Sequence, residues 1–436
     1  MKQSKLSPFK VLRKSKLSLL LLLMSGVNAS LASEEVGVAP GAKGVEVLHW
    51  WTSGGEAQSA EILKNAIEQD GYTWNDFSVA GGGGESAMMV LKARAVSGNP
   101  PTSAQIKGYD IKEWSQLGFL RSIDDVAQTE HWDELLPEVV SRTVKYKGKY
   151  VAAPVNVHRV NQLWINAPLF KKLSLPVPKT LDEFFLVAET IKAAGYIPLA
   201  HGSEAWQNVT LFDVVAMAVL DAEDYYKAFV ELDSATLSGD KMVEVFATFQ
   251  RMRNYIDDKA LGRDWNVATK MVIDGTAAMQ IMGDWAKGEF NVAGKVPGED
   301  YLCVAAPGTE DTFGYNIDSF VFFKTHDPSN VSGQKDVAKV IMSDSFQEAF
   351  NYSKGSLPAR TDISLEGFDL CAQNSMKAFK RAEGTPDMLP SLSADMSTTS
   401  YVKNAVMDVV NEFFNDENAS PEAAAKRLAR VVKAAM

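Results

Sequence analysis

Apolar and polar positions in the first part of the chain alternate between strand-like runs and helical repeats. Residues 45–48 form a short, mostly apolar run without a breaker, which predicts a buried strand. From Glu56 onward, apolar residues recur at helical spacing. The same order returns twice, as a strand at 77–79 with a helix at 85–95, and as a strand at 104–106 with a helix that we expect Asp110 to cap. Three such units predict a parallel sheet in an α/β fold.

The rest of the chain mixes the two patterns. Residues 166–295 are mostly helical by periodicity, with Thr180 as a helix cap, and residues 154–164 look like a crossover between sheets. Further predicted elements are strands at 149–153, 277–282, 303–306 and 313–323, and helices at 335–352 and after Ser420. Within the strand at 313–323, Asn316 and Asp318 are two residues apart, so we expect their side chains on one face.

Aromatic and charged residues follow the predicted strands at their carboxyl ends. Trp50 and Trp51 come directly after the first strand, a Thr-Ser-Gly-Gly turn follows, and Glu56 opens the helix. Lys107 follows the third strand in the same way. Ligands bind at this edge of open α/β sheets, and indole faces beside a carboxylate suit a sugar ring.

Each of these residues also has a structural interpretation. Neighbours on a strand face opposite ways, so in the structural interpretation one of Trp50 and Trp51 only fills the core. Glu56 lies in a first helical turn, where a carboxylate also serves as a capping charge. Lys107 taken alone is typical of a solvated surface lysine. For Lys107, the position at the carboxyl end of a strand favours the site.

Other motifs do not support nucleotide or metal chemistry. Glycines 81–84 match the spacing of neither a dinucleotide loop nor a phosphate loop, and instead indicate a tight turn or a close approach to a ligand. The five histidines, at 49, 131, 158, 201 and 326, lack metal-ligand spacing. Ser332-Gly333-Gln334-Lys335 lacks the companion motifs of a Ser-x-x-Lys enzyme. We therefore expect no cofactor and no metal.

The N-terminal region indicates export. Residues 1–32 combine a basic start, a short apolar run and small residues at 27–32, which is typical of a cleaved signal peptide; a membrane anchor is the alternative. No cysteine follows the run, so a lipid anchor has no acceptor. Removal of the six basic residues would change the net charge from −11 to −17. An acidic protein is a poor partner for nucleic acid or an anionic membrane surface.

The mature part of the 436-residue chain is long enough for two domains and contains two cysteines, Cys303 and Cys371. In an oxidising compartment an even pair suggests one disulfide. Two separate buried thiols are the alternative.

Several longer motifs occur together in a defined order. They are His-Trp-Trp-Thr-Ser-Gly-Gly-Glu at 49–56, Gly-Asn-Pro-Pro at 98–101, Gln-Ile-Lys-Gly at 105–108, Gly-Asp-Trp at 283–285, Tyr-Asn-Ile-Asp-Ser at 315–319 and Lys-Gly-Ser at 354–356. In these motifs the chain resembles the sugar-binding proteins of bacterial ABC importers (extracellular solute-binding protein family 1), and within them the pseudomonad glucose-binding type. The resemblance covers essentially the whole mature chain.

The resemblance implies a two-lobed α/β protein of the type II periplasmic-binding fold with three crossovers between the lobes. It implies one lobe at 45–154 plus 316–354 and the other at 155–315 plus 355–436. The implied ligand-binding residues are Trp50, Trp51, Glu56, Lys107, Trp285, Asn316, Asp318 and Lys354. Trp285 would stack on the sugar from the second lobe. The implied protein is a monomeric periplasmic receptor, not an enzyme, that passes a monosaccharide, expected to be glucose, to a membrane permease.

One position departs from the family pattern. The family has Ser-x-x-His-x-Met where residues 391–396 read Ser-Leu-Ser-Ala-Asp-Met, so Ala394 replaces a histidine. The contact that this histidine would make with a sugar hydroxyl is therefore expected to be missing, or to be supplied by water or by Asp395. Two alternatives also remain: a secreted glycoside hydrolase that uses Glu56 and Asp318 as an acid/base pair, and the same fold binding another hexose or a short oligosaccharide.

Overall fold

The computed structural model describes residues 43–325 and 330–436. The expected signal peptide at 1–32 and His326 lie outside these residues. A five-stranded sheet forms the first lobe. Its strands in spatial order are β2 (Tyr72–Ser78), β1 (Lys43–His49), β3 (Ser103–Lys107), β13 (Asp318–Phe322) and β6 (Ala152–Pro154). β1 runs parallel to β2 and β3, as the three strand–helix units predicted, whereas β13 is antiparallel to β3 and β6.

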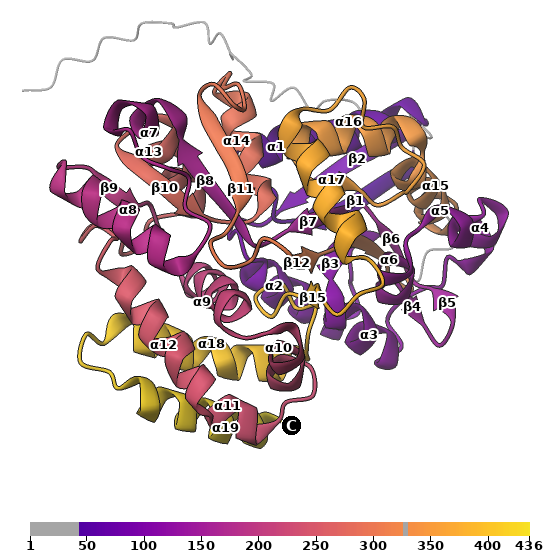
Figure 1. The fold of residues 1–436 in the computed structure, drawn as a ribbon. Coiled ribbons are helices and arrows are strands. Elements are labelled where there is room, and N and C mark those ends of the chain that lie inside the picture. Colours follow the sequence, from indigo (N-terminus) through magenta and orange to yellow (C-terminus); the bar gives the residue numbers. More distant parts are fainter. Residues whose placement is uncertain (1–42, 326–329) are drawn as a thin grey trace, which may run out of the picture. The chain divides into compact units, whose positions relative to one another are not determined.

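Helices pack on this sheet because their apolar faces share its core. They are α1 (Gly54–Gln69), α2 (Glu85–Val96), α3 (Gly108–Gln116), α4 (Asp124–Thr129), α5 (Trp132–Leu135), α6 (Glu138–Thr143), α15 (Asn330–Met342) and α16 (Asp344–Lys354). A small hairpin, β4 (Lys145–Tyr146) and β5 (Lys149–Tyr150), follows α6. In Figure 1 these elements lie on one side of the described chain.

The second lobe has its own sheet and core. Its strands in spatial order are β11 (Tyr301–Ala305), β8 (Gln162–Asn166), β10 (Ala277–Ile281) and β9 (Ile197–Leu199). Its helices are α7 (Ala167–Leu173), α8 (Leu181–Ala193), α9 (Ala205–Val219), α10 (Ala222–Phe229), α11 (Ser234–Ser238), α12 (Asp240–Arg253), α13 (Trp265–Ile273), the 3-10 turn η1 (Asp284–Ala286), α14 (Lys287–Val292), α18 (Ser400–Asn415) and α19 (Pro421–Ala435). Thr180 caps α8 in a capping box with Glu183, as predicted.

A third sheet carries the chain between the lobes. Its strands in order are β14 (Leu357–Pro358), β7 (Asn156–Arg159), β12 (Phe313–Asn316) and β15 (Met388–Pro390). Within residues 43–325 and 330–436, the chain crosses from one lobe to the other through β6–β7–β8, through β12–β13 and through α16–β14. The result is the two-lobed α/β fold with three crossovers.

A disulfide joins Cys303 on β11 to Cys371 on α17 (Leu370–Ala382), with 5.8 Å between the two Cα atoms. The two cysteines are therefore paired and are not separate thiols. The far end of α17 packs in the core of the first lobe through Ala378, Phe379 and Ala382. The disulfide thus ties a helix that contacts the first lobe to a strand of the second.

Four local predictions were wrong. Residues 149–153 are not one strand, because β5 ends at Tyr150 in the hairpin and β6 begins at Ala152 in the first sheet. Residues 313–323 are not one strand, because β12 ends at Asn316 in the third sheet and β13 begins at Asp318 in the first. Residues 335–352 form two helices, since Ser343 caps a new helix by accepting from the Phe346 N–H. Asp110 does not cap α3: the helix begins at Gly108, with Lys107 at the N-cap position.

Candidate functional site

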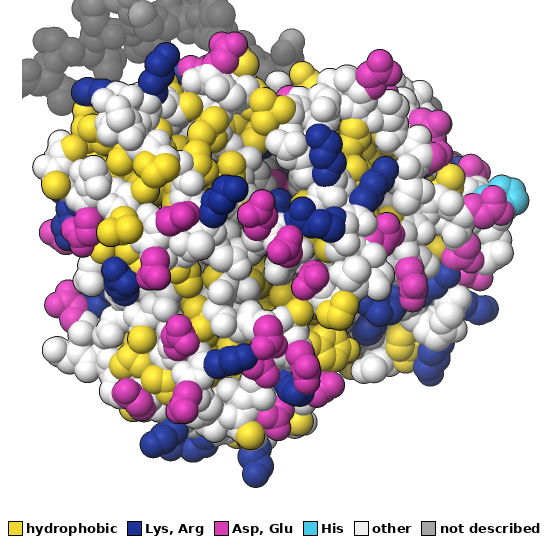
Figure 2. Space-filling view, viewed as in Figure 1, with side chains coloured by type: hydrophobic (Ala, Val, Ile, Leu, Met, Phe, Trp, Pro, Cys, Tyr) yellow, Lys and Arg dark blue, Asp and Glu magenta, His cyan; other side chains and the backbone are white. Residues whose placement is uncertain are grey.

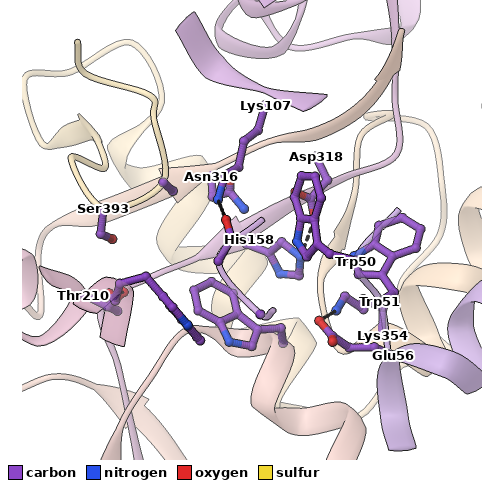
Figure 3. Close-up of a pocket in the computed structure, with 15 residues that line it drawn as sticks. Trp50, Trp51, Glu56, Lys107, His158, Thr210, Asn316, Asp318, Lys354 and Ser393 are labelled. Atoms are coloured by element: carbon purple, nitrogen blue, oxygen red, sulfur yellow. Dashed lines mark hydrogen bonds and ion pairs between the residues drawn. The ribbon is translucent and has the colours of Figure 1, made fainter. Parts of the chain in front are cut away.

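A pocket lies where the two lobes and the third sheet meet (Figure 3). All eight predicted ligand-binding residues line it, although they come from segments far apart in the chain. The full lining is Trp50, Trp51, Glu56, Gly82, Gly83, Lys107, His158, Trp206, Thr210, Trp285, Asn316, Asp318, Lys354, Ser393 and Ala394. In Figure 3, Trp50, Trp51, Glu56 and Lys354 lie on one side, and Thr210 and Ser393 lie across from them.

Glu56 and Lys354 form a buried ion pair in this pocket. Lys354 Nζ donates to Glu56 Oε1 at 2.7 Å, and the two side chains are 1% and 6% exposed. Glu56 comes from the first turn of α1 and Lys354 from the last turn of α16. Each charge is therefore opposite in sign to the partial charge at its helix end, which is favourable. Gly355, with φ 89°, ends α16 at this point because that backbone conformation favours glycine.

Sheet register brings the next group of residues together. Asn316 on β12 is the cross-strand partner of His158 on β7, and Asp318 on β13 is the partner of Lys107 on β3. The break between β12 and β13 therefore places an amide on one sheet and a carboxylate on the next, and both line the pocket. The prediction that they share one strand face was wrong, but both side chains reach the same cavity.

His158 is a pocket residue that sequence reasoning missed. Its Nδ1 pairs with Asp284 Oδ1, and its Nε2 lies 3.2 Å from Asp318 Oδ2. Burial alone would lower the pKa of His158, but the Asp284 and Asp318 carboxylates raise it. A single histidine without a local motif carries no sequence signal for this role, because both carboxylates come from distant segments.

The same contact controls the charge of Asp318. Burial alone would raise the pKa of this carboxyl group, but the hydrogen bond and charge of His158 lower it. The positive charges of Lys354 and Lys107 act in the same direction, and the pKa falls to about 2. Asp318 is therefore an ionised hydrogen-bond acceptor at any physiological pH.

Lys107 lines the pocket beside Trp50. Its Nζ donates to Gly83 O at 3.1 Å and lies 5.5 Å from the centre of the Trp50 ring. Gly82 and Gly83 both pack so closely against indole rings that a Cβ on Gly82 would lie 2.7 Å from the Trp265 ring and one on Gly83 2.7 Å from the Trp206 ring. The absence of side chains at Gly82 and Gly83 therefore lets the backbone approach these indole rings, and the predicted close approach to a ligand stays a prediction.

The pocket tryptophans also pack against neighbouring rings. Trp51 is 2% exposed and packs on Phe320 and Phe350 at centroid distances of 5.6 and 5.1 Å, yet it also lines the pocket. Trp51 is therefore a core residue that also lines the pocket, and its contact with a ligand stays a prediction. Trp285 comes from the second lobe and packs edge-on against His158 at 5.4 Å. Trp206 and Thr210 of α9 also line the pocket, and their helical periodicity gave no indication of this role.

The segment around Ala394 bears on one of the three outcomes expected for the missing histidine. Ser393 and Ala394 line the pocket, whereas Asp395 does not. Asp395 Oδ1 lies 2.8 Å from Lys403 Nζ, and Asp395 Oδ2 lies 3.6 Å from Lys107 Nζ. Because its carboxylate pairs with these two ammonium groups, the expected replacement of the missing histidine by Asp395 is not seen.

The two lobes touch beside the pocket. The Gly55 N–H at the start of α1 donates to Glu289 Oε1 of α14 at 2.8 Å, and the backbone of Gly288 packs so closely on Gly55 that a Cβ atom has no room there. The Tyr109 N–H of α3 also donates to Asp395 O, in the segment between β15 and α18, at 2.8 Å.

Residues 43–325 and 330–436 contain no cluster of three or more His, Cys, Asp or Glu side chains suited to a metal ion. Within the same ranges, no helix has the length and apolar character needed to span a membrane. Figure 2 shows acidic and basic side chains interspersed over the face in view.

A pocket of indoles and paired charges between two lobes is typical of a binding protein. The model of the family described as "Bacterial extracellular solute-binding protein" matches residues 55–327, and the chain belongs to this family. A "Probable sugar-binding periplasmic protein" of Brucella suis biovar 1 (strain 1330) is 42% identical over 420 residues, covering 95% of this chain and 99% of that protein.

A protein of the same name from Rhizobium meliloti (strain 1021) is 44% identical over 394 residues, which cover 90% of this chain and 94% of that protein. Among solved structures, a chitin oligosaccharide binding protein aligns with a TM-score of 0.77 at 18% identity, covering 90% of this chain and 98% of that one. At that identity, the structural match supports the fold alone.

Proposed function

We propose that this protein is a periplasmic receptor that closes around a monosaccharide, with glucose as the preferred hexose, and delivers it to the membrane permease of an ABC importer. Membership of the solute-binding family and the names of the two relatives support the receptor role. The choice of a monosaccharide, and of glucose within that class, rests on the chemistry of the pocket and on the resemblance of its motifs to the glucose-binding type.

The observation that carries this proposal is a buried acceptor without a protein partner. Asn316 Oδ1 lines the pocket and makes no hydrogen bond within the described chain. A buried amide oxygen left unpaired costs about 1–3 kcal/mol, so a ligand hydroxyl that donates to it recovers this free energy. Sugars supply such hydroxyls at fixed positions around a ring.

The remaining walls suit a pyranose ring. Indole faces of Trp50 and Trp285 bury the C–H faces of a sugar, while Asp318 accepts hydrogen bonds from its hydroxyls and Lys107 donates to them. Charge-assisted hydrogen bonds contribute about 1.5–3 kcal/mol each. Several of them, less an association cost of about 4–15 kcal/mol, are compatible with micromolar binding at about −8 kcal/mol.

Ligand contacts from both lobes explain how binding favours closure. Trp50 and Asp318 belong to the first lobe, and Trp285 and Thr210 to the second. A sugar that contacts all four binds the closed state more tightly than the open one and shifts the population toward it. The closed form is then the one presented to the permease.

The hydrolase alternative conflicts with the charges at the site. A glycosidase acid must hold a proton at working pH, which requires a raised pKa. The pKa of Asp318 is instead lowered to about 2, and one oxygen of Glu56 is occupied by the Lys354 ammonium group. These features favour binding without turnover.

The proposal is tested by calorimetric titration of the mature protein with a panel of hexoses. We expect glucose to bind one-to-one with micromolar affinity and its epimers to bind more weakly, because an axial hydroxyl leaves a buried group unpaired. Asn316→Ala and Trp285→Ala should each weaken glucose binding more than tenfold. Tyr226→Ala, at a half-exposed aromatic position outside the pocket, is the matched control.

Two outcomes would contradict the proposal. If no hexose binds the folded wild-type protein, the receptor assignment for monosaccharides fails. If an aryl glucoside is turned over at the pocket, the hydrolase alternative replaces it. Circular dichroism of each variant separates loss of binding from loss of fold.

A further inference from the structure

His158 connects three separate parts of the fold. It lies on β7 in the third sheet, which carries the chain between the lobes, and it lines the pocket (Figure 3). Its Nδ1 bonds to Asp284 Oδ1 in η1 of the second lobe, and its Nε2 lies 3.2 Å from Asp318 Oδ2 on β13 of the first lobe. One imidazole ring therefore bridges two carboxylates that belong to opposite lobes.

All three side chains of this bridge are buried. The side chains of His158, Asp284 and Asp318 are 1%, 3% and 6% exposed. Two buried carboxylates on one ring are unfavourable unless a positive charge lies between them. An imidazolium supplies that charge and donates from both nitrogens, whereas a neutral imidazole has a single N–H. The bridge is therefore complete only when His158 is protonated.

The neutral ring has a different partner within reach. Asn156 Oδ1 accepts from the Asp318 N–H at 3.2 Å, which turns Asn156 Nδ2 toward His158 Nε2 at 3.0 Å. An amide N–H only donates, so this contact requires a lone pair on Nε2, whereas the contact with the Asp318 carboxylate requires a proton there. Loss of the proton therefore exchanges Asp318 for Asn156 as the partner of Nε2.

The surroundings of the ring favour the protonated form. The charged groups that act on its two carboxylates from neighbouring positions are Lys107 of β3, Lys354 of α16 and Arg159 of β7. Although these cations share the carboxylates, the carboxylates still raise the pKa of His158 against the effect of burial. His201 shows the contrast: it is buried beside the Asn208 amide, and burial lowers its pKa to about 4.

We propose that His158 is a positioning residue whose protonated ring joins the two lobes, so that the protein takes up a proton when it closes around the sugar. This inference rests on the proposed function, because it assigns a proton to the closing step of that receptor. His158 acts through Asp318, the carboxylate that accepts from the sugar, and through Asp284, which precedes Trp285.

Movement of the lobes links the proton to closure. Because Asp284 and Asp318 lie in different lobes, opening moves at least one of them away from the ring. With one carboxylate left, the imidazolium is less stabilised, so the pKa of His158 is lower in the open state than in the closed state. The proton therefore stabilises the closed state fully below the open-state pKa, and this contribution is lost as the pH rises through the closed-state pKa.

The test is calorimetric titration of the mature protein with glucose from pH 6 to pH 9, each time in two buffers whose ionisation enthalpies differ. The difference in heat between the two buffers counts the protons taken up per sugar bound. His158→Gln removes the titrating ring, and Asp284→Asn keeps the ring but removes the carboxylate of the second lobe. His131→Asn is the matched control, because that side chain is 71% exposed and asparagine tolerates its φ of 55°.

We expect wild-type protein and His131→Asn to take up a proton on binding, and to bind glucose at least about fivefold more weakly at pH 9 than at pH 6, since one linked proton allows up to about tenfold per pH unit. His158→Gln and Asp284→Asn should bind with no proton uptake and with an affinity that does not change over this range. Asp110, with a pKa of about 7, also titrates in this range, but a signal from it would persist in His158→Gln.

The proton count of the wild type requires no substitution, so it tests the proposal even if His158→Gln does not fold. If the wild type binds glucose without proton uptake, or if a folded His158→Gln or Asp284→Asn takes up as many protons as the wild type, the role of His158 is rejected and the receptor function stands. If no hexose binds at any pH, the proposed function itself fails, and this inference fails with it.

Discussion

Asp318, in the main pocket between the lobes, and Asp110, in an adjoining pocket lined by α2, α3 and α18, are both buried carboxyl groups, but they differ in their partners. Asp318 lies 3.2 Å from His158 Nε2 and opposite Lys107 in the sheet register. Asp110 has one carboxyl oxygen without a partner and lies near the like charge of Asp395. The pKa is lowered to about 2 in the first case and raised to about 7 in the second.

The comparison shows that burial does not by itself decide the charge of a group. Desolvation raises the pKa of both carboxyl groups, and the outcome depends on whether positive charges and hydrogen-bond donors offset it. In the main pocket His158, Lys354 and Lys107 offset the burial of Asp318, whereas Asp110 has one carboxyl oxygen without a hydrogen-bond partner in the described chain. Three measurements would test this difference.

The largest effect is expected from breaking the buried pair of the main pocket. Lys354→Met should lower the free energy of unfolding by about 3–5 kcal/mol, because it leaves the Glu56 carboxylate buried without its cation. Urea unfolding without sugar measures this change. The double variant Glu56→Gln, Lys354→Met removes both charges and should recover most of the loss. Equal stability of the single variant and the wild type would show that the pair is not needed to hold Glu56.

A smaller effect is expected from the pH dependence of Asp318. A carboxyl group whose pKa is lowered on folding from 3.8 to about 2 stabilises the fold above pH 4, and this contribution is lost as the pH falls through 2. Wild-type protein should therefore lose about 2 kcal/mol of stability between pH 4 and pH 2 that Asp318→Asn does not lose. Urea unfolding across this range compares the two; parallel curves would mean that the pKa of Asp318 is unshifted.

The effect expected at Asp110 has the opposite sign. Its pKa is raised on folding from 3.8 to about 7, so the wild type loses stability as the pH rises from about 4 to 7. Asp110→Asn should be more stable than the wild type by about 4 kcal/mol at pH 8, which is the free energy of a pKa shift from 3.8 to about 7, and nearly equal to it at pH 4. The groups that face Asp110 and shift this balance are Asp395, Lys403, Glu113 and Lys92.

Asp408→Asn is the matched control for that measurement. Asp408 lines the same pocket but is exposed, so its neutralisation should leave stability unchanged at both pH values. A loss of stability on Asp110→Asn at pH 8 would show that Asp110 is held ionised by a cation, and the contrast with Asp318 would disappear.

Much of the fold follows from short segments and was predicted from them. The strand, turn and helix at 45–69, the capping box at Thr180 and the parallel pairing of β1 with its neighbours depend on residues close together in sequence. The predicted pocket residues also share a local signal, since Trp50 and Lys107 each follow a strand at the same sheet edge. Patterns of this kind can be predicted because the residues that cause them lie within one short segment.

Predictions failed where partners come from distant segments. The break at Ile317 divides 313–323, because Asn316 pairs with β7 and Asp318 pairs with β3, and no property of the segment itself shows this. His158 gave no signal because the carboxylates that hold it lie 126 and 160 residues away. Asp110 was predicted to cap a helix, and the structure instead leaves its carboxyl group partly unpaired in a pocket floor.

The sequence by itself determined which residue types stand at the ends of the strands, and so the kind of chemistry that the site holds. Only the tertiary structure decided which charges meet: Lys354 reaches Glu56 across 298 residues, while no cation bonds directly to Asp110. Hydrogen bonding and desolvation depend on distances between atoms in space. Asp318 and Asp110 are therefore the same residue type in the sequence. The folded chain makes Asp318 an ionised acceptor and leaves Asp110 an acid with an unpaired oxygen.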